Sequence, residues 1–217
     1  MIINLVMAFL LKEVKVLRNI LICQKLVVLL QRFKIRYMID IANKYVDELK
    51  KKFFYTWGKE KYRYWQINGY DKGCPDIPET NYGEAHFVIL NNDDIIGYIS
   101  YTINRQTRCV WGFEAVNFSE NKILFGLSLF RILKNIFEKD GFNKINFNVA
   151  VGNPIEKSYD KFIEKYGGRI VGYYKDDIIL SNGTLCDYKL YEIMRVDYIK
   201  NKELLINKVT LDDSSEL

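Results

Sequence analysis

The chain has 217 residues, which suits one domain or one domain with an appendage, and 49% of them are hydrophobic and 15% aromatic, enough for a substantial core. Its net charge is +5, and the first 70 residues carry 14 Lys/Arg against 5 Asp/Glu, which suits an anionic partner or simply a solvated helical face. Four widely spaced cysteines and a single histidine argue against a zinc site and favour reduced thiols in the cytoplasm.

Residues 1–37 are predicted to form a helical extension. Their first apolar run is about ten residues long, whereas a membrane-spanning helix needs ~20. Charged residues break the remainder into amphipathic pieces, and no basic region or cleavage site marks a signal peptide. We expect a packed helical segment, with a membrane-surface helix as the alternative. Met38 is an alternative start of the protein, with 1–37 as an upstream extension.

Residues 38–197 are predicted to form the main domain, and 198–217 a polar tail. Hydrophobic periodicity and turn residues divide the domain into short elements. In chain order these are helices 40–54 and 58–67, a loop over 68–83, a hairpin of strands 85–90 and 95–103, strand 110–118, helix 125–139, strand 144–151, helix 154–166, and a hairpin of strands 169–180 and 184–194 around Asn-Gly.

The most informative stretch is residues 141–168. A strand runs into Gly152-Asn153-Pro154 and a helix begins at once, carrying Tyr159 on one side. Asn153 can cap this helix, proline is tolerated in its first turn, and the glycine pair at 167–168 ends it. A strand that diverges from its neighbour just before such a helix makes a slot for a long, thin ligand.

This stretch and the element order resemble the GNAT N-acetyltransferase superfamily over roughly residues 39–196. The resemblance is closest to the ribosomal-protein N-terminal acetyltransferases, in which a DGK-x-x-D turn is common where this chain has Asn182–Asp187. The segment Ile96–Ser100 looks like the third strand of that family. The resemblance implies an α+β fold with a mixed, mostly antiparallel central sheet and helices on both faces.

The resemblance also implies acetyl-CoA as a cosubstrate. In the family, a loop before a helix binds the pyrophosphate through main-chain N–H groups. Here Gly126 matches the motif Gln/Arg-x-x-Gly-x-Gly/Ala and Lys122 would supply a countercharge. Gly112 is expected to form a bulge where the fourth strand diverges. Val149 in the opposite strand and Asn153 after it are expected to contact the cofactor arm.

The same resemblance suggests catalytic roles. Tyr159 would protonate the departing thiolate, with Tyr166 as the other candidate. Glu114 would take the proton of the attacking ammonium, with His86 as the alternative base. A main-chain N–H between residues 113 and 116 would polarise the thioester carbonyl.

We therefore interpret the chain as a cytoplasmic N-acetyltransferase that acts on a primary amine. A protein N-terminus, a lysine, a polyamine and an aminoglycoside all fit, and the aromatic-rich segment 53–66 would form part of the acceptor wall. One alternative is a catalytically inactive binding module of the same fold, because only Gly126 matches the phosphate-loop motif. A nucleic-acid binder is a third possibility without a supporting motif. No metal is expected, and a homodimer is allowed.

Overall fold

The computed structural model describes residues 37–65, 74–120, 122–180 and 182–203. The chain divides into two compact units, and the larger one comprises residues 36–198. The second unit combines the two termini, of which the structure describes only residues 199–203, a helical segment. The predicted N-terminal helical extension lies outside the described residues except for Tyr37.

The described elements follow the predicted order closely. They are β1 (Tyr37–Ile41), a 3-10 turn (Ala42–Tyr45), α3 (Val46–Phe54), a 3-10 turn (Glu60–Tyr62), β2 (Glu84–Asn91), β3 (Asp94–Asn104), β4 (Cys109–Asn117), α4 (Lys122–Lys134), a π-helical turn (Asn135–Lys139), β5 (Lys144–Ala150), α5 (Glu156–Tyr166), β6 (Arg169–Ile179) and β7 (Leu185–Met194). Residues 195–203 are helical. None of the helices in these described ranges is long and apolar enough to cross a membrane.

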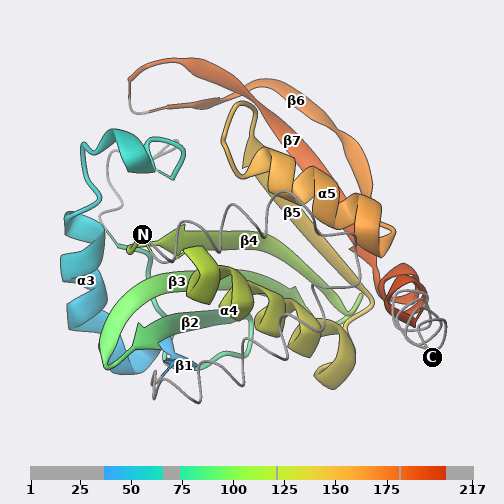
Figure 1. Cartoon of the computed structure of the whole chain (residues 1–217), viewed down its shortest axis with the longest axis horizontal. Coiled ribbons are helices and arrows are strands. Elements are labelled where there is room, and N and C mark those ends of the chain that lie inside the picture. Colours follow the sequence, from blue (N-terminus) through green and yellow to red (C-terminus); the bar gives the residue numbers. More distant parts are fainter. Residues whose placement is uncertain (1–36, 66–73, 121, 181, 204–217) are drawn as a thin grey trace, which may run out of the picture. The chain divides into compact units, whose positions relative to one another are not determined.

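The seven strands form one sheet in the order β1-β2-β3-β4-β5-β7-β6 (Figure 1). Every neighbouring pair is antiparallel except β4 and β5, which are parallel. The predicted mixed, mostly antiparallel sheet is therefore confirmed. The parallel pair lies in the middle of the sheet, so any opening between these two strands is flanked by sheet on both sides.

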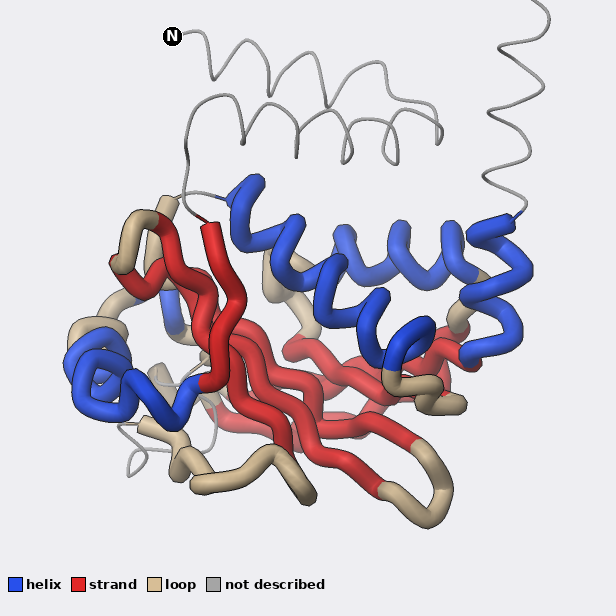
Figure 2. The backbone as a smooth tube through the Cα atoms, turned by 90° about the horizontal axis from the view of Figure 1, so that it is seen from below, coloured by secondary structure: helices blue, strands red, loops and turns tan. Residues whose placement is uncertain are grey.

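Helices cover both faces of this sheet. Gly97 and Tyr98 are neighbours on β3, so they point to opposite faces. Tyr98 packs against Phe53 of α3, with ring centroids 5.2 Å apart. A Cβ on Gly97 would come within 2.7 Å of the Phe125 ring on α4, so a glycine is needed there. α3 and α4 therefore lie on opposite faces, and Figure 2 shows α5 beside α4.

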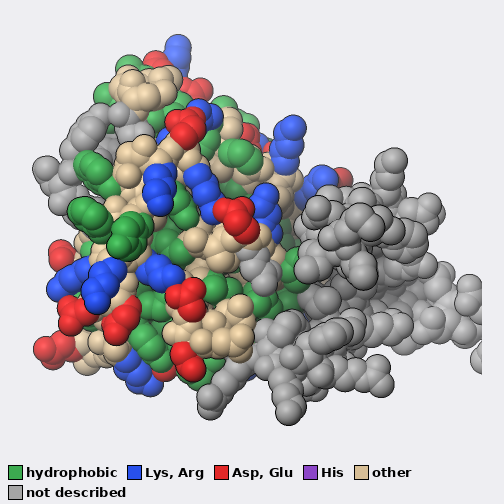
Figure 3. Space-filling view, turned by 60° about the vertical axis from the view of Figure 1, so that its left-hand side comes forward, with side chains coloured by type: hydrophobic (Ala, Val, Ile, Leu, Met, Phe, Trp, Pro, Cys, Tyr) green, Lys and Arg blue, Asp and Glu red, His purple; other side chains and the backbone are tan. Residues whose placement is uncertain are grey.

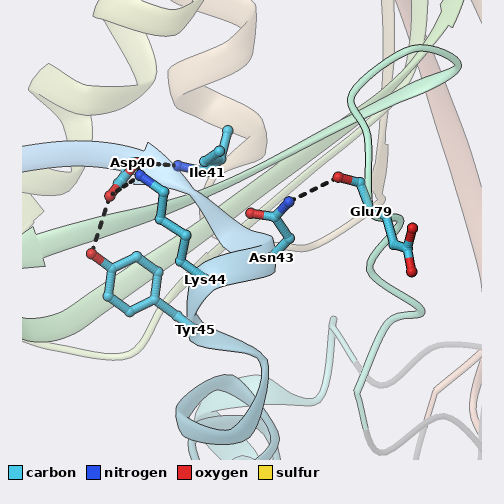
Figure 4. Close-up of polar contacts among 6 residues, drawn as sticks. All are labelled: Asp40, Ile41, Asn43, Lys44, Tyr45 and Glu79. Carbon is cyan, nitrogen blue, oxygen red and sulfur yellow. Dashed lines mark hydrogen bonds and ion pairs between the residues drawn. The ribbon is translucent and has the colours of Figure 1, made fainter.

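The predicted helix 40–54 was wrong in its first part, because residues up to Ile41 belong to β1 and α3 begins at Val46. The cause is a local hydrogen-bond set around Asp40 (Figure 4). Its carboxylate accepts from the Ile41 N–H (2.8 Å), the Lys44 ammonium (2.9 Å) and the Tyr45 hydroxyl (3.1 Å). An aspartate that binds nearby backbone in this way competes with helix formation.

The predicted helix 58–67 was also wrong, as far as the structure describes it. Only Glu60–Tyr62 form a 3-10 turn, and the main-chain hydrogen bonds from Tyr62 and Trp65 reach back three residues instead of four. Gly58 lies just before this turn with a φ of +68°, a conformation that interrupts a helix.

Tyr198 is the last residue of the larger unit, next to the predicted boundary at residue 197. Tyr198 is 1% exposed and stacks on Phe137, with ring centroids 4.7 Å apart. Its hydroxyl donates to the Glu138 carboxylate at 3.0 Å. The first helical turn after β7 therefore completes the core beneath α4.

Candidate functional site

β4 and β5 separate along their length. They pair only at Cys109 with Lys144 and at Val110 with Ile145, although β4 continues to Asn117 and β5 to Ala150. The predicted divergence of these two strands is confirmed. Beyond Val110, the facing edges of β4 and β5 do not share a hydrogen-bond ladder.

The register of β5 shows which of its main-chain groups face the opening. The Val151 N–H donates to Asp187 (3.0 Å), so odd-numbered residues of this strand bond to β7. Backbone groups alternate in direction along a strand, so Asn148 and Ala150 face β4. The Ala150 carbonyl already accepts from the Asn153 N–H at 3.1 Å. The Ala150 N–H and both groups of Asn148 are therefore directed at the opening.

The register of β4 gives the opposite edge. The Phe118 N–H donates to Ile96 of β3 at 2.9 Å, so even-numbered residues at this end of β4 bond to β3. The N–H and carbonyl groups of Ala115 and Asn117 therefore point toward β5. Of the residues 113–116 predicted to supply an N–H to a thioester, Ala115 has the required direction and Val116 does not.

Gly112 forms the bulge that the sequence predicts. Ser100 of β3 pairs with Glu114, whereas Thr102 pairs with Trp111, so β4 contains one extra residue between them. Gly112 has a φ of +60°, which favours glycine. The bulge lies just after the last pair with β5 and bends β4 away from it.

Asn153 forms the turn between β5 and α5. Its side-chain oxygen accepts from the Ile155 N–H at 3.1 Å, but the helix begins at Glu156, so Asn153 precedes the helix and does not cap it. The Glu156 carboxylate accepts from the Gly152 N–H at 3.1 Å. At the far end, Gly167 adopts the left-handed conformation with a φ of 78° and ends α5 as predicted. Val149 is 4% exposed, and as an odd-numbered residue of β5 it pairs through its main chain with Lys189 of β7, so the structure does not direct this predicted contact residue at the opening.

A buried lysine that the sequence analysis missed fixes the first turns of α5. Lys189 of β7 is 4% exposed and pairs with Asp160 (2.7 Å) and Glu156 (3.1 Å). Burial alone would lower the pKa of Lys189, but its hydrogen bonds to these two carboxylates outweigh burial and raise it. The sequence did contain a signal for this contact: Glu156 and Asp160 lie four residues apart in a predicted helix, and Lys189 lies in a predicted strand among apolar residues.

Tyr159 lies on α5 against β5 and β7. Its ring packs edge-on against Phe147 (centroids 5.0 Å apart) and Tyr191 (6.0 Å). Burial raises the pKa of Tyr159 to about 12, with a smaller contribution from Tyr188. Within the described ranges its hydroxyl has no hydrogen-bond partner. Tyr166, the other candidate donor, is 4% exposed and stacks on Tyr198, which makes it a core residue.

Glu114 lies on β4 next to the bulge and is exposed. Ser100 donates to its carboxylate over 3.5 Å. Burial raises the pKa of Tyr188 on β7, and the charge of Glu114 contributes to the same shift. Glu114 is therefore within electrostatic reach of a side chain on the far side of the opening. His86 is 5% exposed and hydrogen-bonded at both ring nitrogens, to Tyr98 and to Glu84.

The predicted phosphate loop leads into α4, which begins at Lys122. Lys122 and Gly126 are exposed, and a Cβ on Gly126 would contact nothing within 4 Å. The nearby Glu120 is paired with Lys61 at 2.6 Å, which lowers the pKa of Glu120. Lys61 also donates to the Ser119 carbonyl at 3.3 Å.

A short segment, residues 60–65, connects the two sides of the opening. Lys61 holds the loop after β4, and the Tyr64 hydroxyl donates to the Gly152 carbonyl after β5 at 2.9 Å. Arg63 donates to the Tyr64 hydroxyl at 2.9 Å and lies over its ring. The sequence predicted 53–66 as an acceptor wall, and 60–65 is the part that reaches the opening.

The earlier part of that predicted wall has a different environment. Phe53 is 2% exposed in the core, whereas Phe54, Tyr55 and Trp57 are 75%, 65% and 47% exposed. Figure 3 shows the side of the molecule that carries α3, where hydrophobic side chains lie among charged ones. These three aromatic residues belong to the surface at the end of α3.

No family model matches the chain, and no curated protein matches it. Among solved structures, the spermidine/spermine N-acetyltransferase SpeG from Vibrio cholerae is 24% identical, over 55% of this chain and 70% of that chain, with a TM-score of 0.47. A mutant form of SpeG is 24% identical, over 56% of this chain and 70% of that chain, with a TM-score of 0.48. A protein described as a "probable acetyltransferase" is 22% identical, over 52% of this chain and 63% of that chain, with a TM-score of 0.44. The function therefore has to be argued from the residues of this chain.

Proposed function

We propose that this protein is an N-acetyltransferase that moves the acetyl group of acetyl-CoA to a primary amine. The observation that carries the proposal is the early end of the β4–β5 ladder. Main-chain groups of Asn148, Ala150, Ala115 and Asn117 face each other there, so an extended chain with amide groups could bond to both edges. The pantetheine arm of acetyl-CoA is such a chain.

Acetyl-CoA supplies an activated thioester, and the residues around the opening supply the remaining chemistry. The Ala115 N–H is directed at the opening and would donate to the thioester carbonyl. Glu114 would accept the proton of the acceptor ammonium. Tyr159 would hold a proton for the departing thiolate, since a tyrosine with an ordinary pKa of about 10 is protonated at neutral pH.

The acceptor would approach from the face that carries Glu114, Tyr188 and Tyr64. The carboxylate of Glu114 favours a cationic amine over a neutral nucleophile. Cys74, Cys109 and Cys186 are free thiols, which suits the proposed cytoplasmic location.

The second candidate is a binding module of the same fold without catalysis. One observation favours it. Lys61 forms an ion pair with Glu120 beside the predicted phosphate loop, so the charges there differ from those expected of an acetyl-CoA site. In this alternative a ligand still binds in the opening, but no acetyl group is transferred.

The test is to incubate the purified full chain with acetyl-CoA and a panel of spermidine, a lysine-containing peptide, a peptide with a free N-terminus and an aminoglycoside. Mass spectrometry of each amine detects a gain of one acetyl group, and calorimetry measures binding of acetyl-CoA. Binding with transfer supports the enzyme, and binding without transfer leaves the module. Absence of both would contradict the proposal.

A further inference from the structure

Three exposed aromatic side chains follow the buried end of α3. Phe53 is 2% exposed and packs in the core. The next three rings along the chain face solvent, with exposures of 75% for Phe54, 65% for Tyr55 and 47% for Trp57. The fold therefore uses Phe53 for its own packing and leaves these three rings accessible to a partner. Residues 51–59, which carry the rings and a lysine at either end, are here called the aromatic tip.

Hydrogen bonds hold the aromatic tip in one shape. The Trp57 N–H donates to the Phe54 carbonyl at 3.2 Å. The Lys59 N–H donates to the Thr56 carbonyl, also at 3.2 Å. Thr56 itself is 4% exposed, and its hydroxyl donates to the Phe53 carbonyl at 2.7 Å. The turn is thus fixed to the core through Thr56, so a partner meets rings whose main chain is already ordered.

The rings lie beside two lysines on this turn. Residues three apart on a helix or a 3-10 turn are neighbours on its surface, so Lys51, Phe54 and Trp57 follow one another along one side. The Tyr55 ring meets the Phe54 ring edge-on, with centroids 6.0 Å apart, and the Lys59 ammonium is 5.9 Å from the Tyr55 centroid. Figure 3 shows hydrophobic side chains beside Lys and Arg side chains on the side of the molecule that carries α3. The surface therefore combines apolar rings with a cation at each end.

The surroundings of the aromatic tip are positively charged. Residues 46–63 contain six Lys/Arg and three Asp/Glu. Glu60, the acidic residue nearest in sequence to the rings, is paired with Arg63. Within the described part of the chain, neither Lys51 nor Lys59 forms an ion pair, and both are exposed. Two cations are therefore available to a negatively charged partner.

The aromatic tip is too small for a stable protein interface and too weakly charged for a nucleic-acid site. At these exposures its three rings offer roughly 400 Å² of apolar surface, because one aromatic side chain buries about 150–250 Å². A stable protein interface buries about 800 Å² on each partner. A nucleic-acid binder commonly contacts about 6–10 phosphates, whereas the tip has two unpaired cations. A lipid surface fits both features, because Trp and Tyr favour the headgroup level of a bilayer and anionic lipids attract lysines.

We propose that the aromatic tip docks the protein on the surface of an anionic lipid bilayer. Phe54 has no polar group and enters the boundary between headgroups and acyl chains. Tyr55 and Trp57 lie at headgroup level, where their rings are buried and their polar groups stay hydrated. Lys51 and Lys59 lie against the anionic headgroups. Docking involves no acetyl transfer, so this inference stands or falls separately from the proposed function.

The first experiment measures sedimentation of the purified full chain with vesicles of phosphatidylcholine alone and of phosphatidylcholine mixed with phosphatidylserine. We expect stronger binding to the mixed vesicles. Phe54→Ser combined with Lys59→Glu should lower the partition coefficient on the order of 10-fold or more, because it removes the ring that enters the bilayer and reverses a charge near its surface. Equal binding of this tip variant and the wild type would overturn the proposal, and so would a wild type that ignores the mixed vesicles.

Tyr82→Ser combined with Arg105→Glu is the matched control. Tyr82 is 71% exposed, and the Arg105 guanidinium lies 4.3 Å from the centroid of its ring. This variant also removes one exposed ring and reverses one cation, so the two variants have the same net charge and both keep residues 1–36. The control should bind vesicles like the wild type. A loss as large as that of the tip variant would mean that binding follows net charge alone and would overturn the role of the tip.

Tryptophan fluorescence locates the contact. The chain has three tryptophans, and Trp57 is the one in the aromatic tip. Brominated lipid in the mixed vesicles should quench part of the wild-type emission, and Trp57→Phe, which keeps an aromatic ring, should abolish that part. Trp111→Phe should retain it, because Trp111 is an exposed tryptophan on β4. Quenching that persists unchanged in Trp57→Phe would overturn the proposal.

Two further measurements identify a different occupant of the aromatic tip. Binding to labelled RNA that depends on the tip and falls steeply with salt would indicate a nucleic-acid surface. Self-association that depends on the tip, measured by sedimentation at rising protein concentration, would indicate a second copy of the chain. Either result without vesicle binding would overturn lipid docking. The result that supports it is vesicle binding of which part survives high salt, because salt screens the lysines and not the rings.

Discussion

The Tyr64 hydroxyl donates a hydrogen bond to the Gly152 carbonyl at 2.9 Å, across 88 positions of sequence. Tyr64 lies in the segment that also holds the loop after β4 through Lys61. A Cβ on Gly152 would lie 3.4 Å from the Tyr64 oxygen, so the two segments are in close contact. The two sides of the β4–β5 opening are thus joined by one short stretch of chain on the side of the proposed acceptor.

Tyr64→Phe should remove this connection while keeping the ring. We expect a loss of stability of ~0.5–1.5 kcal/mol, the usual contribution of one hydrogen bond. The KM for the amine should rise more than the Kd for acetyl-CoA, because the segment faces the acceptor. Tyr82→Phe is the control, because Tyr82 is an exposed tyrosine in the segment just before β2. Equal effects on amine and acetyl-CoA would show that the segment does not select the acceptor.

Tyr159→Phe should lower turnover by on the order of 10- to 100-fold and leave acetyl-CoA binding nearly unchanged. The hydroxyl acts only as the thiolate leaves, and the ring keeps its packing on Phe147 and Tyr191. Single-turnover kinetics and calorimetry measure the two effects separately. Tyr166→Phe should keep full turnover, because its ring lies in the core. Full turnover in Tyr159→Phe would make Tyr159 a structural residue.

A substitution at Gly126 separates an effect on protein stability from an effect on acetyl-CoA binding. Gly126→Ala lies in α4 with open space around the new Cβ, so it should stabilise the protein by up to ~1 kcal/mol. If Gly126 lies against the pyrophosphate, the same variant should bind acetyl-CoA more weakly. Thermal unfolding with and without acetyl-CoA gives both results, and unchanged affinity would remove Gly126 from the phosphate site.

Gly112→Ala should act through the backbone of the bulge. The nearest atom to its Cβ is the Thr102 hydroxyl at 3.5 Å, an ordinary contact, but the φ of +60° costs a non-glycine residue about 1 kcal/mol. We expect that loss in denaturant unfolding, together with weaker acetyl-CoA binding if the bulge relaxes toward β5. Unchanged stability would contradict the strained conformation.

The protein should lose stability in acid through Glu192. This buried carboxylate pairs with Lys144 (3.0 Å) and Arg169 (2.8 Å), and these contacts, led by Lys144, lower its pKa. A lowered folded-state pKa gives stability that is complete above the unfolded value near ~4.3 and is lost as pH falls through the folded value. Urea midpoints measured from neutral pH downward should fall below about pH 5. Glu192→Gln should be less stable at pH 7 and show a shallower decline, and an unchanged decline would contradict the assignment.

The sheet was predictable because its signals are local. Asn-Gly at residues 182–183 and the turn residues between strands 85–90 and 95–103 predicted the two hairpins, and Gly112 predicted the bulge. The start of α3 was not, because helical spacing continues through Asp40 while its carboxylate binds the adjacent turn. The turn at Asn153 was predictable for the same reason as the hairpins, because it depends on adjacent residues.

Contacts between distant segments could not be predicted from spacing alone. The Lys61–Glu120 pair depends on how residues 60–65 cross the opening, and Lys189 becomes a partner of α5 only when β7 pairs with β5. The relation between His86 and Glu114 is of the same kind. Sequence offered these two residues as competing bases, whereas the register of the sheet places them on either side of Ser100.

The most direct measurement is hydrogen exchange of the full chain with and without acetyl-CoA at millimolar concentration, resolved to peptides that cover 111–118 and 145–153. The account predicts slower exchange in both segments, because the amides of Ala115, Asn117, Asn148 and Ala150 would gain partners. The edge hairpin of β6 and β7 serves as the internal reference and should exchange as before. Unchanged exchange in both segments would contradict the placement of acetyl-CoA between β4 and β5.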